Sequence, residues 1–273
     1  MSSVSSLVVS LDELRAVHRL TGACLPRFVV ADDEEDPRVD AAAVRGLAAR
    51  ELVDLRPDQG VLLADPLARL LAPCHAARWI AEIDIEVSRA WDRHAVIVGA
   101  SGTAVVATEL AGGLVSLRLT ETDPLNEMRE LCRLDEVSDE ITAPAAATGL
   151  AVPAEAHRRA DELLLRGAAT AATAVLTAAG VPAPTAQSWI TAVSGRRCAV
   201  AVTVARNHGD GPDGPFEVDE VRWLVAGDGT AWRVRADEPP EHDGDPSPGD
   251  ALSVLTPAGR GELPSALELI TAE

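Results

Sequence analysis

The sequence predicts an α+β protein: a pseudo-two-fold repeat of an αααββββα unit, with antiparallel sheets flanked by helices. Three observations predict it: apolar runs with helical spacing in groups of three, alternating apolar and polar runs in groups of four, and a match between the two halves. The match is clearest where "LVSLRLTETDPLNEMRELC" and "LSVLTPAGRGELPSALELI" align at a constant offset. The shared leucines are Leu114, Leu117, Leu125 and Leu131 in the first segment and Leu252, Leu255, Leu263 and Leu269 in the second.

The first half is expected to begin with three helices. Ser10 and Glu13 fit a capping box, in which each side chain accepts a hydrogen bond from the other's backbone N–H, so a helix should cover 10–20. Apolar spacing then predicts one short strand and two further helices, in "CLPRFVV" (24–30), "AAAVRGLAARELVD" (41–54) and "ADPLARLLA" (64–72).

Four strands are expected to follow, because apolar and polar residues alternate in four successive runs. These runs cover 79–90, 94–102, 103–110 and 114–119. Their short connections require antiparallel pairing, since parallel strands need crossovers of a dozen or more residues. A helix that begins at Pro124 and ends near Leu134 should close this half.

The second half repeats the order after a linker, which predicts a first half at 1–135, a linker at 136–153 and a second half at 154–273, together forming one compact domain. The expected helices cover 153–167, 168–180 and 185–195, and the expected strands cover 196–207, 216–227, 229–237 and 251–255, before a helix at Pro264. "RWIAE" (78–82) and "SWITA" (188–192) resemble each other, so Trp79 and Trp189 are expected to occupy equivalent positions.

Charge and hydropathy restrict the partners and the location. The 24 basic residues, all arginine, and the 43 acidic residues give a net charge of −19. Such a field repels nucleic acid and anionic lipid, so neither is an expected partner. No apolar run approaches 18 residues, and the start lacks the features of a signal peptide, so a cytoplasmic location is predicted.

The residues that usually carry catalysis form no recognisable motif. The histidines lack metal-binding spacing, His157 is expected on a polar helix face, and the cysteines lie in apolar stretches typical of a core. Without lysine, a P-loop and Schiff-base chemistry are excluded. We therefore predict no catalytic, metal or cofactor site. A carboxylate-based hydrolase stays an alternative because acidic residues are numerous.

Tryptophan and arginine in two neighbouring strands suggest a protein-binding surface. Trp223 and Trp232 are expected to face each other, flanked by Arg222, Arg233 and Arg235. Cross-strand packing of these residues under a covering helix is the alternative. The predicted partner-binding residues are Arg206, Arg222, Trp223, Trp232 and Arg233.

The phrase "AAVRGLAARELVDLRPDQGVLLADPLARLLAPC" (42–74), a strand meander and a closing "LTPAGRGELPSALELI" (255–270) resemble the EspG family of actinobacterial chaperones associated with type VII (ESX) secretion. The resemblance covers nearly the whole chain. It implies a cytosolic, non-enzymatic protein with a pseudo-two-fold α/β fold. Such proteins bind the hydrophobic tip of PE–PPE heterodimers, keep them soluble and pass them to the secretion machinery.

Three hypotheses follow. A chaperone for a PE–PPE-like or WxG-type helical secretion substrate predicts an exposed apolar patch on or beside the second sheet. An enzyme of unrecognised class predicts a deep pocket with converging carboxylates or histidines. A structural or regulatory homodimer that pairs through a sheet edge predicts no large free apolar patch.

Overall fold

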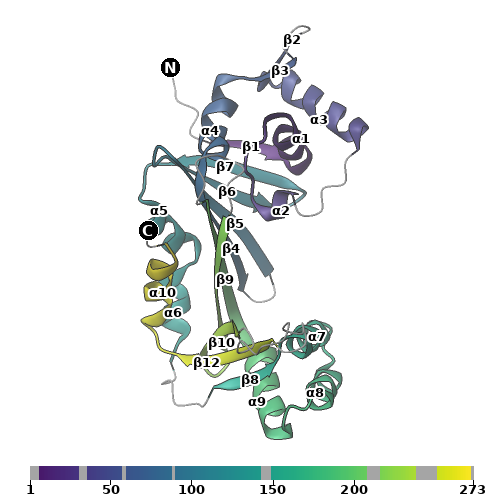
Figure 1. Cartoon of the computed structure of the whole chain (residues 1–273), viewed down its shortest axis with the longest axis vertical. Helices are drawn as coiled ribbons and strands as arrows, with labels where there is room; N and C mark the ends of the chain where they lie inside the picture. The colour runs from purple at the N-terminus through teal and green to yellow at the C-terminus, as the bar shows by residue number, and fades with distance from the viewer. Residues whose placement is uncertain are drawn as a thin grey trace, which may run out of the picture. The chain divides into compact units, whose positions relative to one another are not determined.

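A computed structural model describes residues 6–30, 36–56, 60–87, 90–142, 149–207, 216–237 and 251–271 (Figure 1). The first part of the chain contains β1 (Ser6–Ser10), α1 (Leu11–Thr21), α2 (Arg27–Val30), α3 (Pro37–Ala49), β2 (Val53–Arg56), β3 (Gly60–Leu63), α4 (Asp65–His75), β4 (Ala77–Val87), β5 (Ala90–Gly99), β6 (Ala104–Leu110), β7 (Leu114–Thr120), α5 (Pro124–Leu131) and α6 (Leu134–Glu140). The second part contains β8 (Leu150–Pro153), α7 (Ala154–Leu165), α8 (Ala169–Ala178), α9 (Ala183–Ser194), β9 (Arg196–Asn207), β10 (Phe216–Ala226), β11 (Ala231–Asp237), β12 (Leu252–Ala258) and α10 (Glu262–Thr271).

The described strands form a ten-stranded sheet in the order β1-β7-β6-β5-β4-β9-β10-β11-β12-β8, and β2 and β3 form a separate hairpin. The pairs with a defined register are antiparallel. The two halves of this order mirror each other: β1-β7-β6-β5-β4 in the first half corresponds to β8-β12-β11-β10-β9 in the second. This confirms the predicted α+β class with an antiparallel sheet and flanking helices.

Each repeat also begins with a short strand that the sequence analysis did not predict. β1 pairs with β7, and β8 pairs with β12, so each forms an edge of the sheet. The stretch 136–153, expected as a linker, contains β8 and most of α6. The division of the chain at this stretch stays a prediction.

The expected strand at 24–30 is wrong, because Arg27–Val30 forms the helical turn α2. The backbone N–H groups of Val29 and Val30 both donate to the Pro26 carbonyl, at 2.9 and 3.3 Å. Proline restricts φ to helical values, which favours a helix start here over an extended chain.

The expected equivalence of Trp79 and Trp189 is also wrong. Trp79 lies in strand β4, whereas Trp189 lies in helix α9 and is fully buried. The short phrases that contain them match by letters and not by structure.

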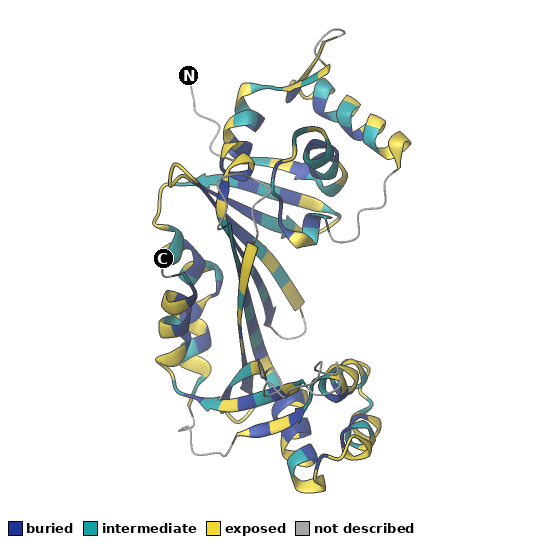
Figure 2. Ribbon diagram, viewed as in Figure 1, coloured by how far each residue is buried: buried dark blue, intermediate teal, exposed yellow. Residues whose placement is uncertain are grey.

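The chain forms two compact units, and each has its own core. The described residues within 1–84, 92–131 and 202–219 belong to the first unit, and those within 85–91, 132–201 and 220–273 belong to the second. In the first core, Leu14 of α1 and Leu70 of α4 cluster with apolar residues of the strands. In the second, Trp189 clusters with Leu176 and Leu255. Figure 2 shows buried and exposed residues alternating along the helices of both units, as expected for amphipathic helices on a sheet.

None of the helices within the described ranges is both long and apolar enough to cross a membrane.

A buried carboxylate fastens α5 to β7 in the first unit. The Glu127 side chain is only 3% exposed and pairs with the Arg118 guanidinium. Thr120 Oγ1 also donates to Glu127 Oε2 at 2.8 Å. Both partners belong to β7, so this single side chain holds the helix against the strand.

Replacement of Glu127 by Ala should therefore lower the free energy of unfolding by about 2 kcal/mol, because Thr120 and Arg118 lose their acceptor. The loss should stay below that of a fully buried pair, since Arg118 is partly exposed and water can solvate it. Urea titration measures the change. Glu130→Ala, at an exposed position of the same helix, should change stability by less than about 0.5 kcal/mol. Equal losses in both variants would contradict this assignment.

Candidate functional site

Four of the five predicted partner-binding residues lie in the second unit, and Arg206 lies in the first. Arg206 is half-buried, and its Nη1 donates to Asp219 Oδ2 at 2.6 Å. The other four, Arg222, Trp223, Trp232 and Arg233, belong to β10 and β11. The structure therefore separates Arg206 from the rest of the predicted set.

The two predicted tryptophans are buried and point to opposite faces of the sheet. The register pairs Trp223 with Arg233 and Leu224 with Trp232. Because adjacent residues of a strand point to opposite faces, the expectation that Trp223 and Trp232 face each other is wrong. Their side chains are 3% and 7% exposed. The role of both residues in partner binding stays a prediction.

A cavity of about 740 Å³ lies in the second unit, where β10 and β11 separate. β10 pairs with β11 only through Arg222–Val225, whereas β11 continues to pair with β12 as far as Asp237. We call this cavity the arginine cavity. Its lining residues are Ala154, His157, Arg158, Asp161 and Glu162 of α7, Glu220 and Arg222 of β10, Arg233, Val234 and Arg235 of β11, and Ser253 of β12.

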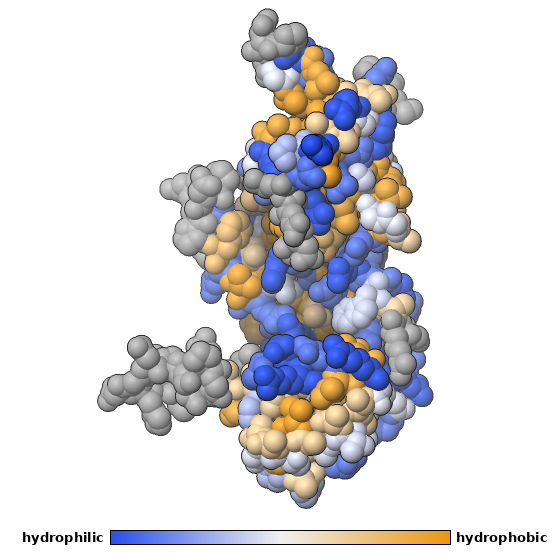
Figure 3. Space-filling view, turned by 90° about the vertical axis from the view of Figure 1, so that its right-hand side faces the viewer, coloured by the Kyte–Doolittle hydropathy of each residue, from blue (hydrophilic) through white to orange (hydrophobic). Residues whose placement is uncertain are grey.

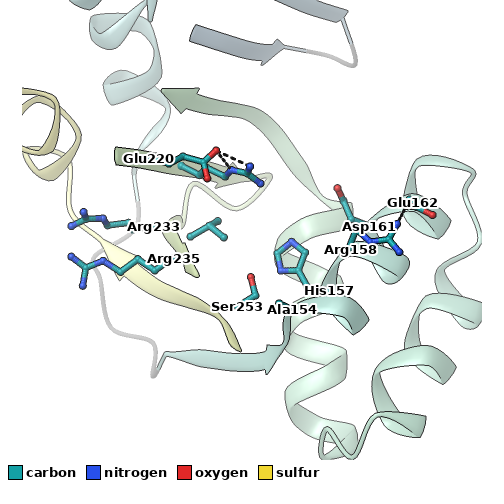
Figure 4. A pocket seen from close by; sticks show the side chains of 11 residues that line it. Ala154, His157, Arg158, Asp161, Glu162, Glu220, Arg233, Arg235 and Ser253 are labelled. Atoms are coloured by element: carbon teal, nitrogen blue, oxygen red, sulfur yellow. Dashed lines mark hydrogen bonds and ion pairs between the residues drawn. The ribbon is translucent and has the colours of Figure 1, made fainter. Parts of the chain in front are cut away.

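The arginine cavity brings together two predicted residues, Arg222 and Arg233, with residues that the sequence analysis did not select. Figure 4 shows the side chains of Arg233 and Arg235 directed away from His157 and Ser253. This follows from the register, in which Ser253 pairs with Ala236 and therefore lies on the opposite face of the sheet from the two arginines. His157 and Ser253 lie between them and the charged residues of α7. The spacing of Arg233 and Arg235 was a usable signal, because residues two apart on a strand share a face.

His157 was expected on a polar helix face. In the structure it is half-buried and packs against Trp189. The two rings are 4.9 Å apart and meet edge to face at 74°. His157 Nδ1 is buried and makes no hydrogen bond to any residue that the structure describes. Burial lowers the pKa of His157; Arg222 and Arg196 lower it further, while Asp161 opposes them. The imidazole is therefore held neutral.

Each carboxylate of the arginine cavity is held in an ion pair with an arginine. Asp161 Oδ1 accepts from Arg196 at 2.7 Å, and Glu220 Oε1 lies 2.7 Å from Arg222. Glu162 pairs with Arg158. These contacts neutralise the acidic lining residues within the protein.

Arg196 connects the cavity wall to the interior of the second unit. Besides Asp161, its guanidinium donates to Glu86 Oε2 at 2.8 Å, and the Glu86 side chain is 6% exposed. Burial would lower the pKa of Arg196, but the two carboxylates raise it above the ordinary value. The group therefore stays charged at any physiological pH and links α7, β9 and β4.

Most lining residues of the arginine cavity are charged or polar, which suits the cavity to binding charged and polar groups. The buried thiols of Cys74 and Cys132 have pKa values raised to about 12 by burial, so both stay protonated. Among the described residues, no three His, Cys, Asp or Glu side chains converge as a metal site would require.

The surface of α7 and α8 is divided between charged and apolar side chains. Figure 3, which views the molecule from the side of these helices, shows a hydrophilic band above a paler, more apolar area in the lower part. The exposed charged residues Glu155, Arg158 and Glu162 lie on α7, and α8 is rich in alanine. Within the described part of the second unit, the exposed large apolar side chains are spread over four elements, at Trp91, Leu165, Leu252 and Leu269.

Arg196→Gln should lower the free energy of unfolding by about 3 kcal/mol, because it leaves Glu86 buried without a counter-ion. Chemical denaturation measures the loss. The neighbouring Arg197 is the matched control, since its pair with Glu140 is exposed, and Arg197→Gln should cost less than about 1 kcal/mol. A small effect of Arg196→Gln would show that Glu86 does not need this partner.

The lowered pKa of His157 predicts a pH dependence of stability. A histidine whose pKa is lower in the folded chain than in the unfolded chain takes up its proton first in the unfolded chain. Its contribution to the free energy of unfolding is therefore complete above pH 6.5 and is lost as the pH falls below 6.5. The stability of the wild type should therefore fall more steeply between about pH 7.5 and about pH 5.5 than that of His157→Gln. Thermal melting across this range measures the difference. His75→Gln, at an exposed position, should follow the wild type, and identical profiles for all three proteins would contradict the prediction.

No protein-family model matches the chain, and no curated protein matches it in sequence. Among solved structures, the chain is similar to the Mycobacterium tuberculosis type VII secretion system chaperone EspG5, which was solved in complex with a PE25–PPE41 dimer. The similarity covers 96% of this chain and 94% of that chain, with a TM-score of 0.52 and 14% sequence identity. The chain thus shares the fold of EspG5 over nearly its whole length.

Proposed function

We propose that this protein is a binding chaperone of the EspG type, which keeps a helical secretion substrate soluble in the cytoplasm. The observation that carries the proposal is the fold similarity to EspG5, because it spans nearly all of both chains. EspG5 holds a PE25–PPE41 dimer in that structure. By analogy, the substrate of this protein is a PE–PPE-like pair or a WxG-type helical protein.

The chemistry of the arginine cavity supports binding in preference to catalysis. A carboxylate-based hydrolase needs one acidic side chain free to carry a proton and another free to attack or to activate water. In the cavity, Asp161, Glu162 and Glu220 are instead each engaged by an arginine. His157 has no hydrogen-bonded partner among the described residues that could orient it as a base.

The proposed binding surface is the rim of the arginine cavity on β10 and β11. Arg222 is exposed there, whereas Trp223 is buried beside it and supports the strand from the other face. Arg233 pairs with Trp223 and lies over its ring, with its guanidinium carbon 5.8 Å from the ring centre, so it occupies the opposite face from Arg222. We propose that Arg222 contacts the partner and that Trp223, packed under Arg233 on the other face, fixes the position of the strand.

Affinity purification of the tagged chain from its native cells, followed by mass spectrometry, tests this function. We expect a helical secretion substrate to co-purify and to form a stable complex with the chain when both are purified. Arg222→Glu should weaken that complex about tenfold or more, because it reverses one charge at the proposed rim. Arg38→Glu is the matched control, since it makes the same charge change at an exposed position of α3 in the other unit.

Two results would count against this proposal. If no helical secretion substrate is recovered, and the chain elutes alone or as a homodimer, the similarity to EspG5 describes the fold only. If a substrate is recovered and both variants bind it equally, the function stands and the proposed rim is wrong.

A further inference from the structure

Two of the four cysteines, Cys24 and Cys74, lie beside each other in the first unit. Cys24 follows α1, and Cys74 is the last residue but one of α4. The backbone N–H of Cys24 donates to the Cys74 carbonyl at 2.8 Å. The last carbonyl groups of a helix have no partner within the helix, so this bond completes the end of α4 and holds the two residues together.

The turn that ends α1 fixes the position of Cys24. Gly22 has a φ of +67°, in the left-handed region, and its N–H donates to the His18 carbonyl at 2.8 Å. His18 Nδ1 in turn donates to the Ala23 carbonyl at 2.7 Å. These two contacts direct the chain from α1 to the end of α4.

The end of α4 is held as closely as the turn. A Cβ atom at Gly99 would come within 2.9 Å of the Pro73 Cα atom, so the backbone of β5 packs directly against this end of the helix. The Ala100 N–H also donates to the Ala76 carbonyl at 2.9 Å. Cys74 is therefore fixed on one side by β5 and on another by Cys24.

The two cysteines are close enough for a disulfide bond. Standard bond lengths on either side of their hydrogen bond keep the two Cα atoms within about 6.7 Å of each other. Disulfides span Cα separations of about 4.4–6.8 Å, so this separation allows a bridge. Both side chains also enter the same core, in which Cys74 is fully buried and Cys24 packs against it.

The raised pKa of Cys74 indicates that the two sulfur atoms are neighbours. Burial, and then the negative charge that Cys24 carries as a thiolate, raise the pKa of Cys74 to about 12. Cys132 and Cys198 lie in the second unit, and no other cysteine contributes to their raised pKa values. Cys24 is only half-buried, so a reagent in solution reaches it before Cys74.

We propose that Cys24 and Cys74 form a reversible disulfide when a low-molecular-weight disulfide oxidises the chain, and that this bond clamps the turn after α1 to the end of α4. The inference does not depend on the proposed chaperone function, because it concerns contacts within the first unit alone. In a reducing compartment the pair stays as two thiols, and it closes when the ratio of disulfide to thiol rises.

The reaction proceeds in two exchange steps. The Cys24 thiolate attacks one sulfur of the reagent, which releases one reagent thiol and leaves a mixed disulfide on Cys24. Cys74 then loses its proton, attacks the Cys24 sulfur and releases the second reagent thiol. Two electrons pass from the cysteines to the reagent, and their two protons end on the released thiols. The mixed disulfide carries no charge, so the second step begins without the thiolate that opposes ionisation of Cys74.

Incubation of the reduced full chain with glutathione disulfide, followed by peptide mapping by mass spectrometry, tests the proposal. We expect a Cys24–Cys74 disulfide within one chain, with Cys132 and Cys198 still present as thiols. The bond closes a loop of about fifty residues, so the Tm should rise by about 5 °C or more and fall again when dithiothreitol is added. Glutathione that stays attached to Cys24, a disulfide between two chains, or a bridge to Cys132 or Cys198 would overturn the proposal.

Two variants show whether the shift in Tm comes from this bond. Cys24→Ala removes the accessible thiol of the pair, so its Tm should not rise on oxidation. Cys198→Ala is the matched control, because it removes a thiol from the second unit and should respond like the wild type. Variants that respond alike would overturn the proposal. Circular dichroism of each reduced variant establishes that it is folded, and peptide mapping of the wild type decides the question if one is not.

Discussion

The guanidinium of Arg196 is the contact on which the second unit depends. It joins Glu86 of β4 and Asp161 of α7, so one side chain of β9 fixes a neighbouring strand and the helix that lies over the sheet. Because α7 is placed in this way, His157 rests against Trp189 and the charged residues of α7 form one wall of the arginine cavity. A neutral residue at 196 could not do this, since two carboxylates would then face each other with no cation between them.

Much of the fold could be predicted because it depends on local rules. The Ser10–Glu13 capping box is present, with Glu13 N–H donating to Ser10 Oγ at 3.1 Å and Ser10 N–H donating to Glu13 Oε2 at 2.8 Å. Alternating apolar residues also located the strands of both halves, because this pattern depends only on neighbouring residues in the sequence. The edge strands β1 and β8 were missed because they have only five and four residues, too few to show a period. Their alternation becomes meaningful only when β7 and β12 pair with them.

The site was harder to predict because it depends on register and on contacts between distant segments. The turn in which Ala226 N–H donates to the Thr230 carbonyl sets the pairing of β10 with β11, and a shift of one residue exchanges the two faces. The expectation that Trp223 and Trp232 face each other assumed a register one residue away from the observed one. Nothing in the sequence around His157 indicates that α7 lies beside strands more than sixty residues later in the chain.

The charge composition of the protein explains the ion pairs of the arginine cavity. Every cation is an arginine, and acidic residues outnumber arginines, so most arginines in the cavity region find a carboxylate within their own unit. This local pairing cancels charge where the chain folds and leaves an acidic field at a distance. Removing any of these arginines would leave a carboxylate without its cation, so the composition of the chain and the stability of the second unit depend on the same contacts.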